Sequence, residues 1–199
     1  MKSTTFVLYI VMMFIPYMGF SQYNIFGAAA AQGKFVAQDL EINTSLVGLH
    51  TVFETPLSTY SMRFGFDYFS RIGMPSSSGG SVSNVWLLKA MGGKLINEGG
   101  RVQVPLFAGL SIMTPTGDLE FPEDKKSKFG LSAAGGLRIY ISNRFALFGE
   151  AIVDGTVFTD YSYTGSAGSQ VTSNVLAYNI AGTVGICFVY RQKRDNNTK

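Results

Sequence analysis

The stretch Asn174–Tyr190, NVLAYNIAGTVGICFVY, alternates between two kinds of side chain along its whole length. Its even-numbered positions, from Leu176 to Tyr190, are nearly all large and apolar, whereas its odd-numbered positions, such as Asn179, are mostly small or polar. A period of two residues is typical of a β-strand with two different faces. The small face carries no charge before Arg191. The pattern therefore indicates a wall with lipid outside and a tightly packed, polar interior.

Eight alternating segments of this kind lie between turn signals. They are Tyr23–Lys34, Ser45–Glu54, Ser58–Arg71, Val82–Met91, Arg101–Thr114, Lys128–Ser142, Arg144–Val157 and Asn174–Tyr190. The connections alternate between shorter ones (55–57, 92–100 and 142–143) and longer ones rich in Ser, Gly, Asp and Lys (35–44, 72–81, 115–127 and 158–173). An even strand count with long loops at one end predicts an all-β fold, an eight-stranded antiparallel up-and-down transmembrane β-barrel. The segments around residues 28–31 and 82–91 show the weakest alternation, and their register stays open.

The first residues of the chain are typical of a cleaved signal peptide. Lys2 supplies a positive start, Phe6–Ile15 an apolar stretch, and Gly19-Phe20-Ser21 a small-residue cleavage site. The alternative is a membrane-spanning helix, but the apolar stretch is shorter than the roughly 20 residues that a span needs, and Pro16 interrupts it. We therefore expect residues 1–21 to be the signal peptide, 22–190 the barrel domain and 191–199 a polar tail.

Composition argues against several kinds of site. The chain has one Cys and one His among 199 residues, too few for a zinc set, and its net charge of +3 is too weak and dispersed for nucleic-acid binding. Acidic residues between 118 and 124 stand beside lysines in a spacing that matches no calcium loop. We expect no metal, no cofactor and no nucleic-acid partner.

The charges in the strands fall on the face opposite the large apolar side chains. This inward set comprises Arg63, Asp67, Arg138, Glu150, Asp154 and His50. Pairing of the sixth and seventh strands around Asn143 would make Arg138 and Glu150 diagonal neighbours. Because eight strands leave a bore that side chains can fill, we expect a structural ion-pair network, with a gated ion path as the alternative.

The sole histidine bears on the question of catalysis. A hairpin turn at Pro56-Leu57 would place His50 opposite Arg63 on the inner face, near the end of the barrel with the shorter turns. A lipid-modifying barrel enzyme needs a nucleophile and a base that reach the substrate. An inward histidine does not meet this need, so we expect a hydrogen-bonded lumen residue and no catalytic set.

Aromatic residues with polar tips gather near the expected strand ends. They are Trp86, Tyr60, Tyr68, Tyr178 and Tyr190. Such rings favour the membrane–water interface, so these five residues are predicted to form two aromatic girdles.

Several short motifs resemble the OmpA/OmpX-like superfamily of small outer-membrane β-barrel proteins, in the porin-family version common in Bacteroidetes. They are Phe20-Ser21-Gln22 at the end of the signal, Val102-Gln103-Val104-Pro105-Leu106, and Gly130–Ile141 followed by Asn143-Arg144-Phe145. Barrels of this group usually end on a terminal aromatic residue, whereas here a polar tail, Arg191–Lys199, follows Tyr190. The resemblance implies a monomeric, non-enzymatic protein of the cell outer membrane of a Gram-negative bacterium. It also implies a structural, adhesion or surface-recognition role, with outer-membrane lipid around the wall and a surface ligand or envelope protein at the long loops.

Three other functions stay open at this point. A soluble, exported, lipocalin-like barrel would turn its apolar face inward around an apolar ligand, and it would require charged outward faces, which the last strand lacks. A lipid-A-modifying barrel enzyme would depend on His50. The third alternative is an accessory barrel of a secretion machine, and no residue of the sequence supports or excludes it.

Overall fold

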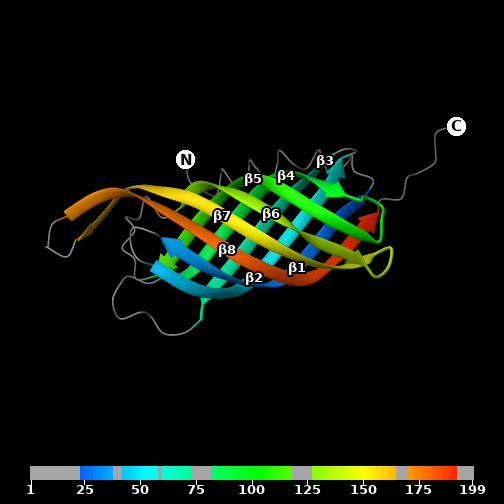
Figure 1. Ribbon diagram of the computed structural model, residues 1–199, viewed down its shortest axis with the longest axis horizontal. Helices are drawn as coiled ribbons and strands as arrows, with labels where there is room; N and C mark the ends of the chain where they lie inside the picture. Colours follow the sequence, from blue (N-terminus) through cyan, green and yellow to red (C-terminus); the bar gives the residue numbers. More distant parts are fainter. Residues whose placement is uncertain are drawn as a thin grey trace.

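The computed structural model describes residues 23–37, 42–57, 60–72, 82–117, 127–164 and 170–191. The predicted signal peptide and nearly all of the polar tail lie outside the described residues. Eight strands follow one another around a closed antiparallel barrel in chain order (Figure 1). They are β1 (Tyr23–Ala37), β2 (Ile42–Leu57), β3 (Tyr60–Arg71), β4 (Val82–Ile96), β5 (Val102–Gly117), β6 (Lys128–Tyr140), β7 (Phe145–Thr164) and β8 (Gln170–Arg191). The predicted fold is confirmed. The described residues include no helix long and apolar enough to cross a membrane.

The strand register sets the tilt of the wall. A row of paired residues followed once around the barrel from Ile25 returns to β1 at Phe35, ten residues further along the strand. For eight strands, this offset corresponds to a tilt of about 40° and a bore that side chains fill. The tilt is visible in Figure 1, where the strands cross the barrel obliquely.

Several predicted boundaries are wrong, mainly because strand pairing continues through residues that read as turns or loops. β4 runs to Ile96 instead of Met91, and the predicted connection 35–44 is shortened because β1 ends at Ala37 and β2 begins at Ile42. Leu57 pairs with Tyr60, so β2 runs through Pro56 and the connection to β3 is residues 58–59. A proline is tolerated near the end of a strand, where few ladder hydrogen bonds remain to be lost. The segment 158–173, predicted as a loop, is mostly strand, because β7 continues to Thr164 and β8 begins at Gln170.

The β7–β8 hairpin reaches beyond the rest of the barrel. β6 pairs with β7 only as far as Thr156, and β1 pairs with β8 only as far as Ala177. Past these residues β7 and β8 pair with each other alone, up to Thr164 opposite Gln170. Figure 1 shows this yellow and orange hairpin projecting past the other strands. Among the described strands, both of its outer edges are unpaired.

The two faces of the wall differ as the alternation predicted. On β8, Val184 is 75% exposed and Ile186 59%, whereas Asn179 is fully buried. The same sorting holds on β4, where Leu88 is exposed and Leu87 and Lys89 are buried. Since large apolar side chains face outward on every strand and the charged ones are mostly inside, the barrel has the surface of a protein embedded in lipid.

Candidate functional site

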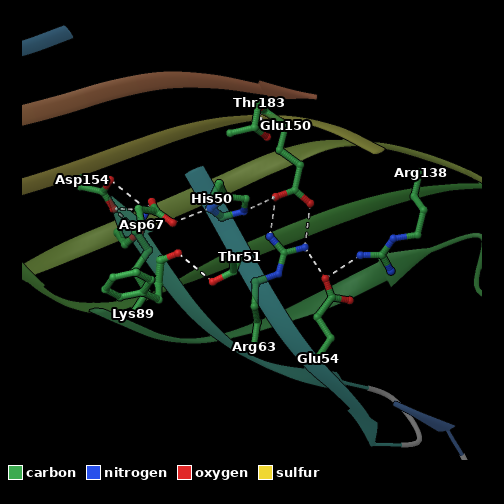
Figure 2. Close-up of polar contacts among 12 residues, drawn as sticks. His50, Thr51, Glu54, Arg63, Asp67, Lys89, Arg138, Glu150, Asp154 and Thr183 are labelled. Atoms are coloured by element: carbon green, nitrogen blue, oxygen red, sulfur yellow. Dashed lines mark hydrogen bonds and ion pairs between the residues drawn. The ribbon is translucent and has the colours of Figure 1, made fainter. Parts of the chain in front are cut away.

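A four-residue ion-pair group occupies the middle of the lumen (Figure 2). The Arg63 guanidinium on β3 donates to both carboxylate oxygens of Glu150 on β7, at 2.6 and 2.8 Å. It also donates to Glu54 on β2, its paired neighbour in the sheet, at 2.5 Å. Arg138 on β6 reaches the same oxygen of Glu54 at 2.5 Å. The four charges cancel, and they tie four strands together across the bore.

Arg63 is the centre of this group. Its side chain is fully buried, and its guanidinium carbon lies 3.9 Å from the centre of the Phe107 ring. A bidentate arginine–carboxylate pair has strict geometry and is stronger than a single hydrogen bond. Removing one partner from such a buried pair leaves the other as an uncompensated charge, which is strongly destabilising. Arg63 therefore stabilises the arrangement of the charged side chains inside the barrel.

A second polar group lies beside the first. The Nζ atom of Lys89 on β4 lies 2.6 Å from Asp67 and 2.9 Å from Asp154 on the opposite wall. His50 Nδ1 and Asp67 Oδ1 are 2.6 Å apart, and Asp154 also accepts a hydrogen bond from the Ser132 hydroxyl at 2.6 Å. Asp154 thus has a cation and a hydroxyl donor in a site closed to solvent, as a buried carboxylate requires.

His50 connects the two groups. Its other ring nitrogen, Nε2, is 3.9 Å from Glu150 Oε2. The predicted pairing of His50 with Arg63 is wrong, because the later turn shifts the register and sets His50 opposite Asp67. His50 also lies further from the turn than predicted, seven residues before the last residue of β2. The inward direction of His50 is as predicted, and the ring is fully buried.

The expected neighbourhood of Arg138 and Glu150 is only half realised. The register is as predicted, with Gly136 opposite Glu150 and Arg138 opposite Phe148. The side chains nevertheless choose different partners, since Arg138 bonds to Glu54 and Glu150 to Arg63. Contacts across the bore form in place of diagonal contacts along the wall, because a narrow barrel brings opposite strands within reach of long side chains.

Two members of the network were missed from the sequence. Glu54 is the last residue of the predicted strand Ser45–Glu54, directly before residues that read as a turn, where a charged side chain is expected to face water. Lys89 lies on a strand where both faces are apolar and where Lys94 occupies the opposite parity. The position along the strand could have identified Lys89. Lys89 lies near the middle of β4, at the level of the membrane centre, whereas Lys94 lies two residues from the end of the strand. A lysine at mid-depth is expected inside, where a carboxylate can pair with it.

Apolar side chains close the bore on either side of the charges. Toward the ends joined by the longer connections, one cluster includes Phe35, Leu46, Phe69, Leu87 and Phe158. Toward the other end two further clusters lie, one around Phe148, Val52, Cys187 and Val189 and one around Phe107, Met91 and Ile152. Among the described residues, no three His, Cys, Asp or Glu side chains are placed to hold a metal ion. The lumen is therefore a filled core, and its charged groups are enclosed by apolar layers.

The five aromatic residues expected at the interface divide between the two ends of the outer face. Tyr60 (67% exposed) and Tyr190 (53%) lie at the end with the shorter connections. Tyr68, Trp86 and Tyr178 lie in the other half of the wall. The rings of Tyr68 and Trp86 are 4.3 Å apart at their centres, and the Tyr68 hydroxyl donates to Asn84 at 2.9 Å. Each ring thus presents an apolar body and a polar tip, which suits a membrane interface.

Comparison with known proteins gives the fold a context. No protein-family model matches the chain, and no curated protein matches it. Among solved structures, neisserial surface protein A, NspA, superposes with a TM-score of 0.61 at 13% identity, over 84% of this chain and 97% of that one. Ail, the attachment invasion locus protein of Yersinia pestis, gives 0.52 at 10% identity, over 85% and 99%. The outer membrane protein AlkL, solved in lipid bilayers, gives 0.50 at 13% identity, over 88% and 94%.

These neighbours are small barrels, and nearly the whole length of each is covered. At such low identity the likeness establishes the fold. Function has to be argued from the wall, the lumen and the projecting hairpin.

Proposed function

We propose that this chain is an integral protein of the Gram-negative outer membrane, a member of the OmpA/OmpX-like group of barrels. In this proposal it anchors a surface-recognition element and neither conducts ions nor catalyses a reaction. The observation that carries the proposal is the sorting of charge, with Arg63, Arg138 and Glu150 buried in the lumen and large apolar side chains outside. A soluble lipocalin-like barrel would need the opposite arrangement.

The filled lumen argues for an anchor rather than a pore. Ions would have to pass the apolar cluster around Phe35 and Phe69 and then displace the paired charges of Arg63 and Glu150. Breaking buried pairs costs several kcal/mol per site, with no compensation along the path. The same enclosure argues against catalysis on lipid, because His50 is fully buried and cannot meet a substrate at the outer wall.

The projecting β7–β8 hairpin is the best candidate for recognition. It rises beyond the barrel at the end with the longer connections, which is the cell-surface end in barrels of this kind. Unpaired strand edges offer rows of N–H and C=O groups that another chain can bind. Two neighbours of the same fold support a surface role, since one is named a surface protein and the other an attachment invasion locus protein.

The test is to shorten the hairpin without touching the barrel. Residues 159–174 are replaced by an Asn-Gly turn that joins Phe158 directly to Val175, which leaves the Phe158–Val175 pair in place. We expect the shortened chain to reach the outer membrane and to migrate as a folded barrel, but to lose the binding of intact cells to extracellular-matrix or host-cell surfaces. In the same cells, external protease is expected to cut the full-length chain within 159–173. Unchanged binding by the shortened chain would refute the recognition role.

A further inference from the structure

A groove runs obliquely across the outer wall from β3 to β7. Its volume is about 850 Å³, and almost all of the surface that lines it is apolar. Its floor is made of small outward residues on neighbouring strands, namely Gly92, Ala108, Ala133, Gly135 and Ala151. The register places them in two adjacent cross-strand rows, Gly92–Ala108–Ala133 and Gly135–Ala151. The first row continues to Val153 and the second begins at Leu106, the large outward residues that border the floor.

The groove is hollowed relative to the row of the wall beside it. In the adjacent row, Leu110 pairs with Leu131, and both are strongly exposed at 59% and 70%. A Cβ atom added to Gly92 would meet nothing within 4 Å, so the hollow is open at that point. Bilayer chains must fill such a hollow, because an empty apolar space loses its dispersion contacts.

The end of the groove nearest the shorter connections carries polar groups. Lys94 and Tyr60 both line it, and both are exposed. Ser61 pairs with Gly93, and Tyr60 and Lys94 are the residues next to this pair on β3 and β4. Within the described part of the chain, Lys94 has no carboxylate partner. A cation beside a tyrosine at the membrane interface is complementary to the phosphate of a lipid headgroup.

The dimensions match one leaflet. Four strand spacings of about 4.8 Å separate β3 from β7, which gives a length of about 19 Å. Along the membrane normal, the groove climbs from Tyr60, the first residue of β3, to Ala151, six residues into β7. Lys94, Gly135 and Ala151 lie on one cross-strand row, and a row about 19 Å long that is inclined by about 40° to the membrane plane rises about 12 Å. That rise lies within one leaflet, whose share of the bilayer's hydrocarbon thickness is about 15 Å.

We infer that this groove holds one phospholipid of the periplasmic leaflet, its phosphate at Lys94 and one acyl chain along the floor of Gly and Ala residues. The inference rests on the proposed membrane location, which puts the end with the shorter connections in the periplasm. The small residues let the chain lie against the wall, and the tilt of the strands guides it from the headgroup level to the middle of the membrane.

The test compares variants that fill the groove with variants that add the same bulk elsewhere. The mature chain is inserted into nanodiscs of phosphatidylethanolamine and phosphatidylglycerol and extracted with detergent, and the phospholipid retained per barrel is measured by native mass spectrometry. Ala108→Leu with Ala133→Leu fills the floor, and Ala28→Leu with Ala30→Leu is the control, because these alanines are exposed on the outer face of β1. Lys94→Gln removes the headgroup contact, and Lys34→Gln removes another exposed outer lysine.

We expect the wild type and both controls to retain one phospholipid per barrel. Retention should fall about tenfold when the floor is filled, since a few methylene contacts are lost. It should fall about fivefold in Lys94→Gln, the effect of one lysine near an anionic headgroup. Each variant is first checked for the gel mobility of a folded barrel.

Three outcomes would overturn the inference or its basis. Equal retention in the wild type and the filled variant would show that the groove holds no particular lipid. A dimer that disappears with the same variants would assign the groove to a second copy of the chain. A wild-type chain that fails to enter the bilayer at all would refute the proposed membrane location instead.

Discussion

Replacing Arg63 with methionine should be among the most damaging single changes inside the barrel. Arg63 makes three short contacts with Glu54 and Glu150, at 2.5, 2.6 and 2.8 Å, and it is fully buried. Arg138 would still neutralise Glu54, but Glu150 would keep only the distant contact with His50 at 3.9 Å. Removing one partner of a buried pair in this way costs about 3–5 kcal/mol.

The assay is equilibrium unfolding in urea from detergent micelles, followed by the fluorescence of Trp86, the only tryptophan. With an m-value of about 2 kcal/mol per molar urea, a loss of about 4 kcal/mol moves the midpoint down by about 2 M. The control Lys34→Met removes an exposed charge from the outer face and should move it by no more than about 0.3 M.

A second variant separates charge imbalance from lost packing. Arg63→Met combined with Glu150→Met leaves no unpaired charge at this contact, so the double variant should recover at least half of the lost stability. If Arg63→Met unfolds within about 0.3 M of the wild type, the charged groups are hydrated rather than buried. In that case the lumen would be open to water and not closed by its apolar layers.

Three further predictions follow from the wall and the lumen. Gly136→Ala should destabilise the barrel by about 1–3 kcal/mol in the same urea assay, because the new Cβ atom would clash with the carbonyl oxygen of Gly149. Gly155→Ala is the control, since its Cβ atom would meet open space and the unfolding midpoint should not change. Leu110 is exposed in the middle of β5, so Leu110→Arg should lower the free energy of unfolding in lipid vesicles by about 2–4 kcal/mol. If Leu110→Arg is as stable as the turn variant Ser142→Arg, the wall does not face lipid. The wild type should be silent in planar-bilayer recordings, and steady channel steps from it would rule out the apolar closure.

The faces of the strands could be predicted from the sequence because membrane and lumen impose opposite demands on neighbouring residues. On β3, β6 and β7 the charged residues of the predicted strands all fall on one parity, the other parity is free of charge, and the structure places Arg63, Arg138 and Glu150 inside the barrel. On β4 this signal fails, since both faces are apolar and each carries a lysine. Only the depth of Lys89 and its pairing with Asp67 and Asp154 reveal which lysine is inside.

The partners within the lumen could not be predicted, because they depend on distances across the bore. Sequence patterns give neighbours along and beside a strand, but the contacts of Glu54 with Arg138 and of Glu150 with Arg63 join residues 84 and 87 positions apart. Turn placement added a second error. Moving the β2–β3 connection from Pro56-Leu57 to residues 58–59 keeps the parity of every side chain but changes the partner of His50. The extension of the β7–β8 hairpin was not predicted because residues 159–164 and 170–173 are mostly polar on both faces, and such a segment lacks the alternation that indicates a strand.

The central claim is that the apolar face meets lipid while the charged network stays enclosed. Its most direct test is the mobility of the chain on a denaturing gel, with and without boiling, after extraction from the outer-membrane fraction in mild detergent. We predict that the unboiled chain resists the denaturing detergent and migrates differently from the boiled one. A chain that is soluble without detergent and runs at one position in both lanes would mean that the faces are reversed.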